Sequence, residues 1–138
     1  MIDLRRWTEQ LNDIRTTLEA TGQGCLLIVA TTDPALEKDL ADLLTEALDG
    51  RVESWTFDPS YPSLAAYLGT LPLDGPRVVL AHGLDRLPAE ARTRALRHLN
   101  REREALARTG RSIVLFIRPE TVHDLTFQAG DFWSWRSG

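Results

Sequence analysis

Side chains capable of acid and base chemistry directly follow an apolar run at residues 78–81. His82 and Asp85 lie just after this run, within the stretch RVVLAHGLDRL. Many hydrolases use a histidine beside a carboxylate as a general base and its orienting acid. The same residues also suit a plain turn, in which Asp85 caps a helix that begins near Pro88. Both interpretations stay open at the level of the sequence.

A hydrolase at this position would also need a nucleophile. Thr31 and Thr32, which follow the apolar run at residues 25–30, are the only candidates expected nearby. A zinc site is not expected, because Cys25 is the single cysteine and the three histidines lack the spacing of a ligand set. We therefore predict no metal centre.

The elements that must position these groups alternate along the chain. Short apolar or β-prone runs predict strands at residues 25–30, 51–57, 77–81 and 112–117. Apolar residues spaced three and four apart predict helices at 35–48, 63–71 and 89–108, and a last short helix starts at Pro119. Strands that alternate with helices form a parallel sheet covered on both faces. The predicted fold class is therefore α/β, a three-layer sandwich with a four-stranded, mainly parallel sheet.

The carboxyl ends of such strands meet in one crevice, where ligands usually bind. The predicted order of elements therefore brings together a polar cluster at the strand tips. Its members come from the end of the third strand and from the residue that follows the fourth: His82, Asp85, Arg86 and Arg118.

One domain accounts for all 138 residues. We expect an N-terminal helix at residues 1–20, an α/β core at 24–120, and a C-terminal helix with an aromatic tail at 121–138. No apolar run approaches the roughly 20 residues of a membrane helix, and the N-terminus lacks the pattern of a secretory signal. The sequence thus predicts a cytoplasmic protein with no membrane partner.

The charge of the chain argues against nucleic acid as a partner. The net charge is -4, although helix 89–108 carries more arginine than acid. No aromatic residue that would stack on bases lies between those arginines, and we expect a solvated face there. Fifteen arginines against the single Lys38 are explained most simply by a GC-rich genome.

Three segments together resemble the nucleotide-binding core of P-loop ATPases. They are the first strand with its following helix, the stretch RVVLAHGLDRL, and the stretch SIVLFIRPE at the fourth strand. The closest branch is that of the signal-transduction ATPases with numerous domains, whose NACHT-type members end the third strand in a DGLDE-like motif. The resemblance covers residues 24–120. It implies a phosphate-binding loop after the first strand, a magnesium site at the third and a sensor residue at the end of the fourth.

The stretch ATTDPALEKD at residues 30–39 departs from the phosphate-binding loop that the resemblance implies. It has no glycine, and Asp33 places a negative charge where phosphate would sit. Leu36 and Glu37 stand where the family has Lys and Ser or Thr, while Lys38 comes two positions late. The sequence therefore predicts lost phosphate binding.

The end of the third strand departs in the same direction. His82 takes the position of the magnesium-linked Asp, and Arg86 takes that of the acid that activates water. Magnesium prefers carboxylate oxygens, and an arginine accepts no proton at ordinary pH. We expect no catalytic residues and no cofactor.

The remaining use for such a domain is a non-catalytic scaffold or sensor that acts by protein–protein contact. A partner protein or a second copy would bind the uncovered sheet edge or the C-terminal tail, which contains Phe132, Trp133, Trp135 and Arg136. These aromatic residues could instead close the domain's own core. Relatives of this type imply a bacterial signalling or defence setting.

The alternative function is an ATP- or GTP-binding switch with a non-standard phosphate loop. Thr31, Thr32 and Lys38 would then surround the phosphates, and Asp85 would hold a magnesium-bound water. The hydrolase that uses His82 and Asp85 is the third possibility.

Overall fold

Four parallel strands form one sheet at the centre of the fold. The computed structural model describes Asn12, Thr16 and residues 24–48, 51–60, 63–72 and 74–136. The strands are β1 (Leu26–Ala30), β2 (Val52–Thr56), β3 (Val78–His82) and β4 (Ser112–Ile117). Their order across the sheet is β1-β4-β3-β2, and all three pairings are parallel. The predicted α/β class and sheet are therefore confirmed, with β4 inserted between β1 and β3.

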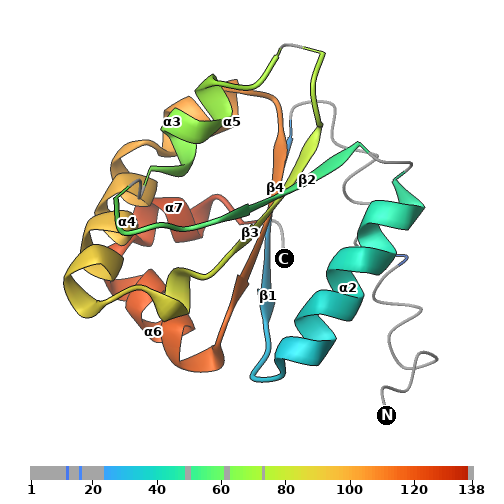
Figure 1. Cartoon of the computed structure of the whole chain (residues 1–138). Coiled ribbons are helices and arrows are strands. Elements are labelled where there is room, and N and C mark those ends of the chain that lie inside the picture. The colour runs from blue at the N-terminus through green and yellow to red at the C-terminus, as the bar shows by residue number, and fades with distance from the viewer. Residues whose placement is uncertain are drawn as a thin grey trace.

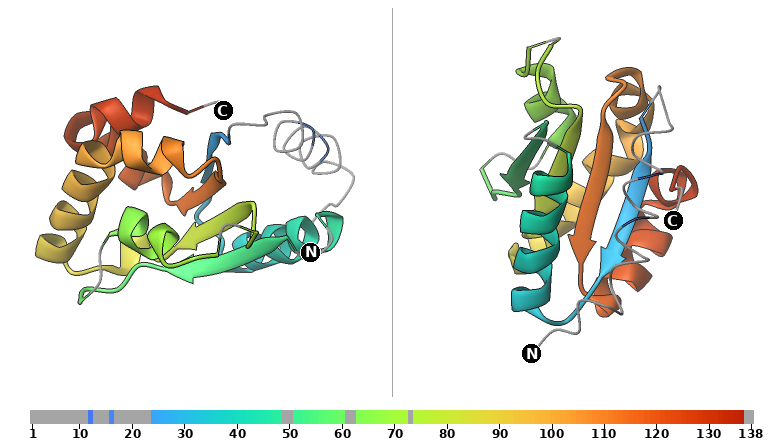
Figure 2. Two further views of the ribbon diagram at one scale, coloured as in Figure 1. Left: turned by 90° about the horizontal axis from the view of Figure 1, so that it is seen from above. Right: turned by 90° about the vertical axis from the view of Figure 1, so that its right-hand side faces the viewer.

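Helices cover both faces of this sheet. One face carries α2 (Pro34–Ala47), which crosses in front of the strands in the right-hand view of Figure 2. The other face carries α3 (Leu64–Gly69), α4 (Ala89–Arg101), α5 (Arg103–Arg108), α6 (Pro119–Gln128) and α7 (Gly130–Ser134) (Figure 1). The arrangement is a three-layer sandwich in which most of the described helices lie on one face of the sheet.

The two layers of core follow from the alternation of side chains along each strand. Leu27, Val114 and Phe116 face α2, where Leu40 and Leu44 are buried against them. The residues that alternate with these along β1 and β4 point to the opposite face of the sheet, where α3 to α7 lie. Burial of each α2 leucine contributes about 1.5–3 kcal/mol. All six residues of β4 are buried, as expected for a strand with both neighbours and both faces covered.

The helix predicted at residues 89–108 is wrong in one respect, because it is divided in two. The backbone at Glu102 leaves the helical conformation, with φ -98° and ψ 12°, between α4 and α5. Glu102 also turns its carboxylate toward α3, where Ser63 donates to it. The break is therefore associated with a contact outside the helix itself, which helical periodicity does not reveal.

The prediction for the N-terminal end is mostly untested, and the C-terminal end contains one more helix than predicted. The predicted helix at residues 1–20 falls outside the described residues, apart from Asn12 and Thr16, which are helical. The tail predicted after residue 120 contains the second short helix α7 in addition to α6. Among the described residues, no helix combines the length and the apolar character needed to cross a membrane.

Candidate functional site

Three of the four residues predicted for the strand-tip cluster come together at the carboxyl edge of the sheet, and His82 is not among them. Asp85, Arg86 and Arg118 line one cavity there, together with Thr31 and Thr32 from the other side. The cavity has a volume of about 20 Å³, which is room for about one water molecule. Lys38 does not line it and is exposed on α2. The structure thus assembles three of the four residues expected for a nucleotide switch around a very small space.

The start of α2 is capped by a carboxylate of the chain itself. Asp33 Oδ1 accepts a hydrogen bond of 2.9 Å from the amide of Ala35, and the Asp33 amide donates to Thr31 Oγ1 at 3.1 Å. Pro34 then opens the helix as predicted. An acid in this place satisfies the positive end of the helix. Asp33 therefore occupies the amino end of α2.

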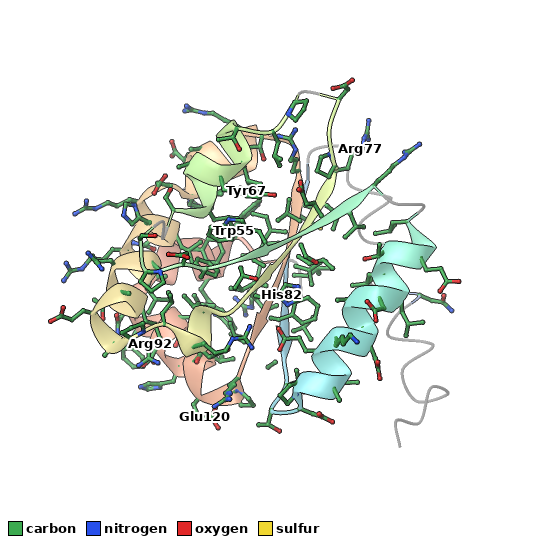
Figure 3. All side chains as sticks on the ribbon, viewed as in Figure 1. Trp55, Tyr67, Arg77, His82, Arg92 and Glu120 are labelled. Atoms are coloured by element: carbon green, nitrogen blue, oxygen red, sulfur yellow. The ribbon has the colours of Figure 1, made fainter. Side chains whose placement is uncertain are left out.

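His82 and Glu37 join β3 to α2 across 45 residues of sequence. The distance between His82 Nδ1 and Glu37 Oε1 is 2.7 Å, and the two side chains are 13% and 21% exposed. The imidazole also stacks on Phe116, with ring centroids 4.7 Å apart and planes inclined by 5°. Figure 3 places His82 on the side of the sheet that faces α2. The histidine is therefore held by a carboxylate on one side and an aromatic ring on another.

Asp85 has a different partner from the one predicted. Its carboxylate accepts hydrogen bonds from the Arg118 amide, at 3.1 and 3.2 Å, and from the hydroxyl of the buried Thr121. It therefore holds the start of α6, and the prediction that it caps the helix near Pro88 is wrong. The reason is topological, because β3 and β4 are neighbours and their tips lie side by side. Asp85 is also not placed as an orienting acid for His82, whose Nδ1 faces Glu37.

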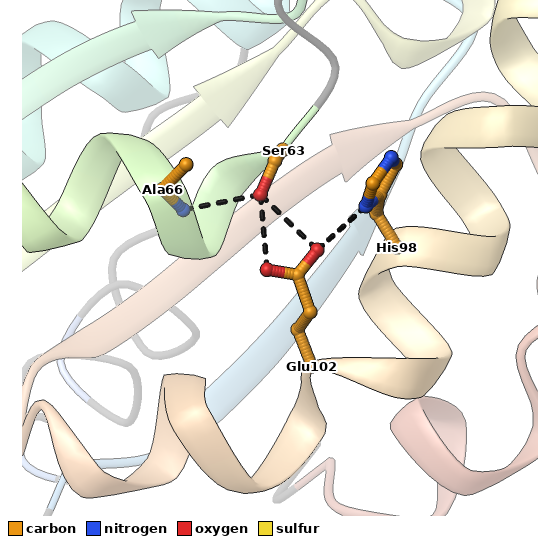
Figure 4. A network of polar contacts seen from close by, with 4 residues as sticks. All are labelled: Ser63, Ala66, His98 and Glu102. Carbon is orange, nitrogen blue, oxygen red and sulfur yellow. Dashed lines mark hydrogen bonds and ion pairs between the residues drawn. The ribbon is translucent and has the colours of Figure 1, made fainter.

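A second cluster of catalytic residue types lies on the opposite face and was not predicted from the sequence. Ser63 Oγ donates to the Glu102 carboxylate at 3.0 and 3.1 Å, and His98 Nδ1 lies 2.7 Å from the same carboxylate (Figure 4). In a catalytic triad the histidine stands between serine and acid and takes the serine proton. Here the acid is in the middle, so His98 is not in position to activate Ser63. Ser63 also caps α3 by accepting from the Ala66 amide, and the network fastens α3 to α4.

Two ionisable groups near the β2 side of the sheet have shifted pKa values. Burial raises the pKa of Tyr67 to about 12, and a hydrogen bond and the charge of Glu53 act in the same direction. The Tyr67 ring stacks on Trp55 at 5.3 Å. Hydrogen bonds from Ser60 lower the pKa of the exposed Asp58. Burial and the neighbouring Glu53 account for the raised pKa of Tyr67.

The C-terminal aromatic residues have unequal environments. Phe132 is fully buried in the core beneath α4, so it cannot form part of an exposed binding surface, and the core alternative applies to it. Trp133 and Trp135 are half-buried against the same cluster. The exposed Arg136 lies over the Trp133 ring, 4.1 Å from its centroid, and pairs with β1 at Leu26. The tail thus closes part of the core, and Trp133 and Trp135 remain partly exposed.

A third polar feature lies at the amino edge of the sheet, where sequence reasoning did not look. Arg51, Arg77 and Arg111 line a cavity of about 500 Å³. The signal was present in the sequence, because each of these arginines stands immediately before a predicted or observed strand. It was missed because ligand sites in parallel sheets are expected at the other edge.

No protein-family model, curated protein or solved structure matches the chain. Within the described part of the chain, no three His, Cys, Asp or Glu side chains are grouped in a way that would hold a metal ion.

Proposed function

We propose that this protein is a non-catalytic scaffold or sensor domain, derived from a signalling P-loop ATPase, that acts by protein–protein contact. One observation carries the proposal. Near the strand tips, at positions where the resemblance places a nucleotide and its magnesium ion, Glu37, Asp33 and Asp85 are bonded to other groups of the chain.

The contact between Glu37 and His82 is the most direct support. By the resemblance, Glu37 stands where the family has a magnesium-binding hydroxyl, and His82 stands where it has the magnesium-linked acid. In this chain the two side chains meet directly at 2.7 Å, a distance that leaves no room for an ion between them. A charge-assisted hydrogen bond in a half-buried setting stabilises the folded state by about 1–3 kcal/mol. On this proposal, the contact between Glu37 and His82 takes the place of a contact that the family makes through its magnesium ion.

Two further carboxylates support the same conclusion. Asp33 accepts a hydrogen bond from an amide at the start of α2, and Asp85 accepts one from an amide at the start of α6. β1, β3 and β4, the strands that carry the resemblance, are neighbours in the sheet, and the tips of all three are engaged in these contacts. The remaining cavity of about 20 Å³ is far below the 300–1,000 Å³ of ordinary small-molecule sites.

The proposed contact surface consists of the exposed parts of Trp133 and Trp135 together with Arg136, which is exposed. Tryptophan and arginine are the residue types most enriched at the centres of protein interfaces. The partner is a protein or a second copy of the chain. Trp133→Ala and Trp135→Ala should weaken association, measured by light scattering or by capture of the identified partner, and both variants should still unfold cooperatively.

Thermal unfolding with and without magnesium ATP tests the lost nucleotide site. A ligand at one hundred times its dissociation constant stabilises a protein by about 2.7 kcal/mol, which for a chain of this size is a shift of roughly 10 °C in Tm. We expect that magnesium ATP causes no increase in Tm that substitutions at the strand tips would remove. A shift that Lys38→Ala or Thr32→Ala removes would overturn the scaffold proposal.

That result would favour the ATP- or GTP-binding switch, the second candidate. The observation behind it is that Thr31, Thr32 and Asp85 line one cavity at the edge where ligands of parallel sheets bind. Lys38 and Thr32 are the better test positions because Asp85 holds α6, so that its removal would change stability by itself.

A further inference from the structure

Three arginines stand in one row at the amino edge of the sheet, away from the strand tips. Arg51, Arg77 and Arg111 immediately precede β2, β3 and β4. The register aligns Val52 with Val78 and Val78 with Ser112, so the residues before them share the next row. Side chains in one row of a parallel sheet leave the same face. Figure 3 shows Arg77 at this end of β3, far from His82 and Glu120.

The three arginines line a cavity that is large enough for a small molecule. Its volume is about 500 Å³, within the range of about 300–1,000 Å³ for ligand sites. Its other walls come from the loop before β3, with Asp74 and Gly75, and from the end of α5, with Thr109 and Gly110. Asp74 is the only acid among the described residues that line it.

Arg111 is the most informative member of the row because it is only 8% exposed. Its Nε donates to the Pro76 carbonyl at 2.8 Å, and its Nη2 donates to the Pro72 carbonyl. Both acceptors are neutral, so they position the guanidinium without neutralising it. A guanidinium has five N–H donors, and these two contacts leave three of them for other acceptors. Loss of hydration around a buried charge is costly unless an opposite charge approaches.

The row also concentrates like charges. Positive side chains on directly opposed positions of neighbouring strands repel one another. Within the described residues, the ion pairs involve other side chains, and none joins Arg51, Arg77 or Arg111 to an acid. With Asp74 as the one acid in the lining, the described walls carry a surplus of two positive charges. An anion in the cavity would remove both the repulsion and the cost of the buried guanidinium.

We propose that this cavity binds a small anion with two or more phosphate charges. Arginine presents paired donors in a plane that matches the oxygens of a phosphate, and three such forks around one cavity favour a multiply charged ligand. The site lies at the opposite end of the strands from the tips, about 17 Å away for a five-residue strand. The anion site is therefore separate from the proposed scaffold function. If the scaffold proposal fails, the proposal of an anion site is unaffected.

Isothermal titration calorimetry with inorganic pyrophosphate at fixed ionic strength tests the site. The main variant is Arg51→Gln/Arg77→Gln, since both side chains are exposed and their loss spares the core. The matched control is Arg94→Gln/Arg97→Gln, which removes the same charge from the exposed face of α4. Loss of one charge-assisted hydrogen bond weakens binding about tenfold, so we expect at least that loss in the main variant and little change in the control.

Two further measurements locate the binding. Asp74→Asn removes the one described acid from the lining and should tighten binding severalfold. In NMR spectra of the parent protein, pyrophosphate should shift the amide signals of Gly75, Gly110 and Arg111. If ATP raises Tm, removal of that shift by Arg51→Gln/Arg77→Gln would assign it to this cavity, whereas removal by Lys38→Ala would assign it to the strand tips.

Three results would overturn the proposal. One is a dissociation constant for pyrophosphate weaker than about 1 mM. Another is an equal loss of binding in the two double variants, because it would show an effect of net charge alone. The third is equal competition by sulfate at the same ionic strength, which would mean that the arginines attract anions without a defined site.

Discussion

Removal of the Asp85 carboxylate should destabilise the fold without any involvement of magnesium. Asp85→Ala deletes a cap at the start of α6, which is worth about 0.5–2 kcal/mol. It also removes a charged partner from the hydroxyl of Thr121, which is only 5% exposed, at a further cost of about 1.5–3 kcal/mol. We expect a total loss of about 2–5 kcal/mol, or roughly 10–20 °C in Tm for a chain of this size. The variant should still fold, since domains have about 5–15 kcal/mol of stability.

The assay is urea unfolding followed by tryptophan fluorescence, with and without magnesium. Thr121→Val removes the same hydrogen bond from the other side, and the double variant should lose less than the sum of the two single variants, by about 1 kcal/mol. The matched control is Glu120→Ala, which removes an exposed carboxylate from the first turn of the same helix and should cost about 0.3–1 kcal/mol. Figure 3 shows Glu120 pointing away from the fold.

Two outcomes would refute this reasoning. If Asp85→Ala were as stable as the parent protein, the carboxylate would not hold α6. If magnesium stabilised the parent protein and Asp85→Ala abolished that gain, Asp85 would be a metal ligand, as the switch hypothesis requires. A stability loss that is the same with and without magnesium distinguishes the helix anchor from the metal site.

Three other predictions follow from the packing. Phe132→Ala should cost about 3–5 kcal/mol in urea unfolding because the ring is fully buried, whereas Arg136→Ala should cost less than about 1 kcal/mol; equal losses would contradict the described core. Because burial raises the pKa of Tyr67 to about 12, the absorbance of its phenolate should appear only well above pH 10. In Glu53→Gln the absorbance should appear at a lower pH than in the parent protein. Since the unfolded value is about 10, stability should fall as pH rises between the two pKa values, and Tyr67→Phe should abolish that fall. Glu102→Gln and Ser63→Ala should each cost about 1–2 kcal/mol with strong coupling in a double-mutant cycle, and additive losses would exclude the network of Figure 4.

The elements of this fold could be predicted because their signals are local. The strand predicted at 112–117 has the observed bounds of β4, and Asp33 with Pro34 marks the start of α2 as the sequence indicates. Continuous apolar runs also indicate a parallel sheet with two covered faces. The break at Glu102 lies beyond such reasoning, because the carboxylate is bonded to Ser63, 39 residues away.

The contacts within the site could not be predicted, because they join residues whose distance depends on strand order. Topological rules brought His82 and Asp85 to one edge of the sheet but did not say which strand lies beside β3. With β4 as that neighbour, Asp85 reaches α6, and Glu37 of α2 reaches His82. Proximity in sequence suggested a dyad of His82 and Asp85, whereas each residue is bonded to a group more than 30 positions away.

The two edges of the sheet differ in how their charges are matched. At the carboxyl edge, Asp33 and Asp85 lie at helix starts and Glu37 meets His82, so each of these acids has a partner within the chain. At the amino edge, the described residues that line the cavity include three arginines and one aspartate. A site that is satisfied internally has little free energy to gain from a ligand, whereas one with surplus buried charge gains from any fitting counter-ion. If this chain still responds to a small molecule, the physical argument therefore favours the edge at which parallel sheets seldom bind one.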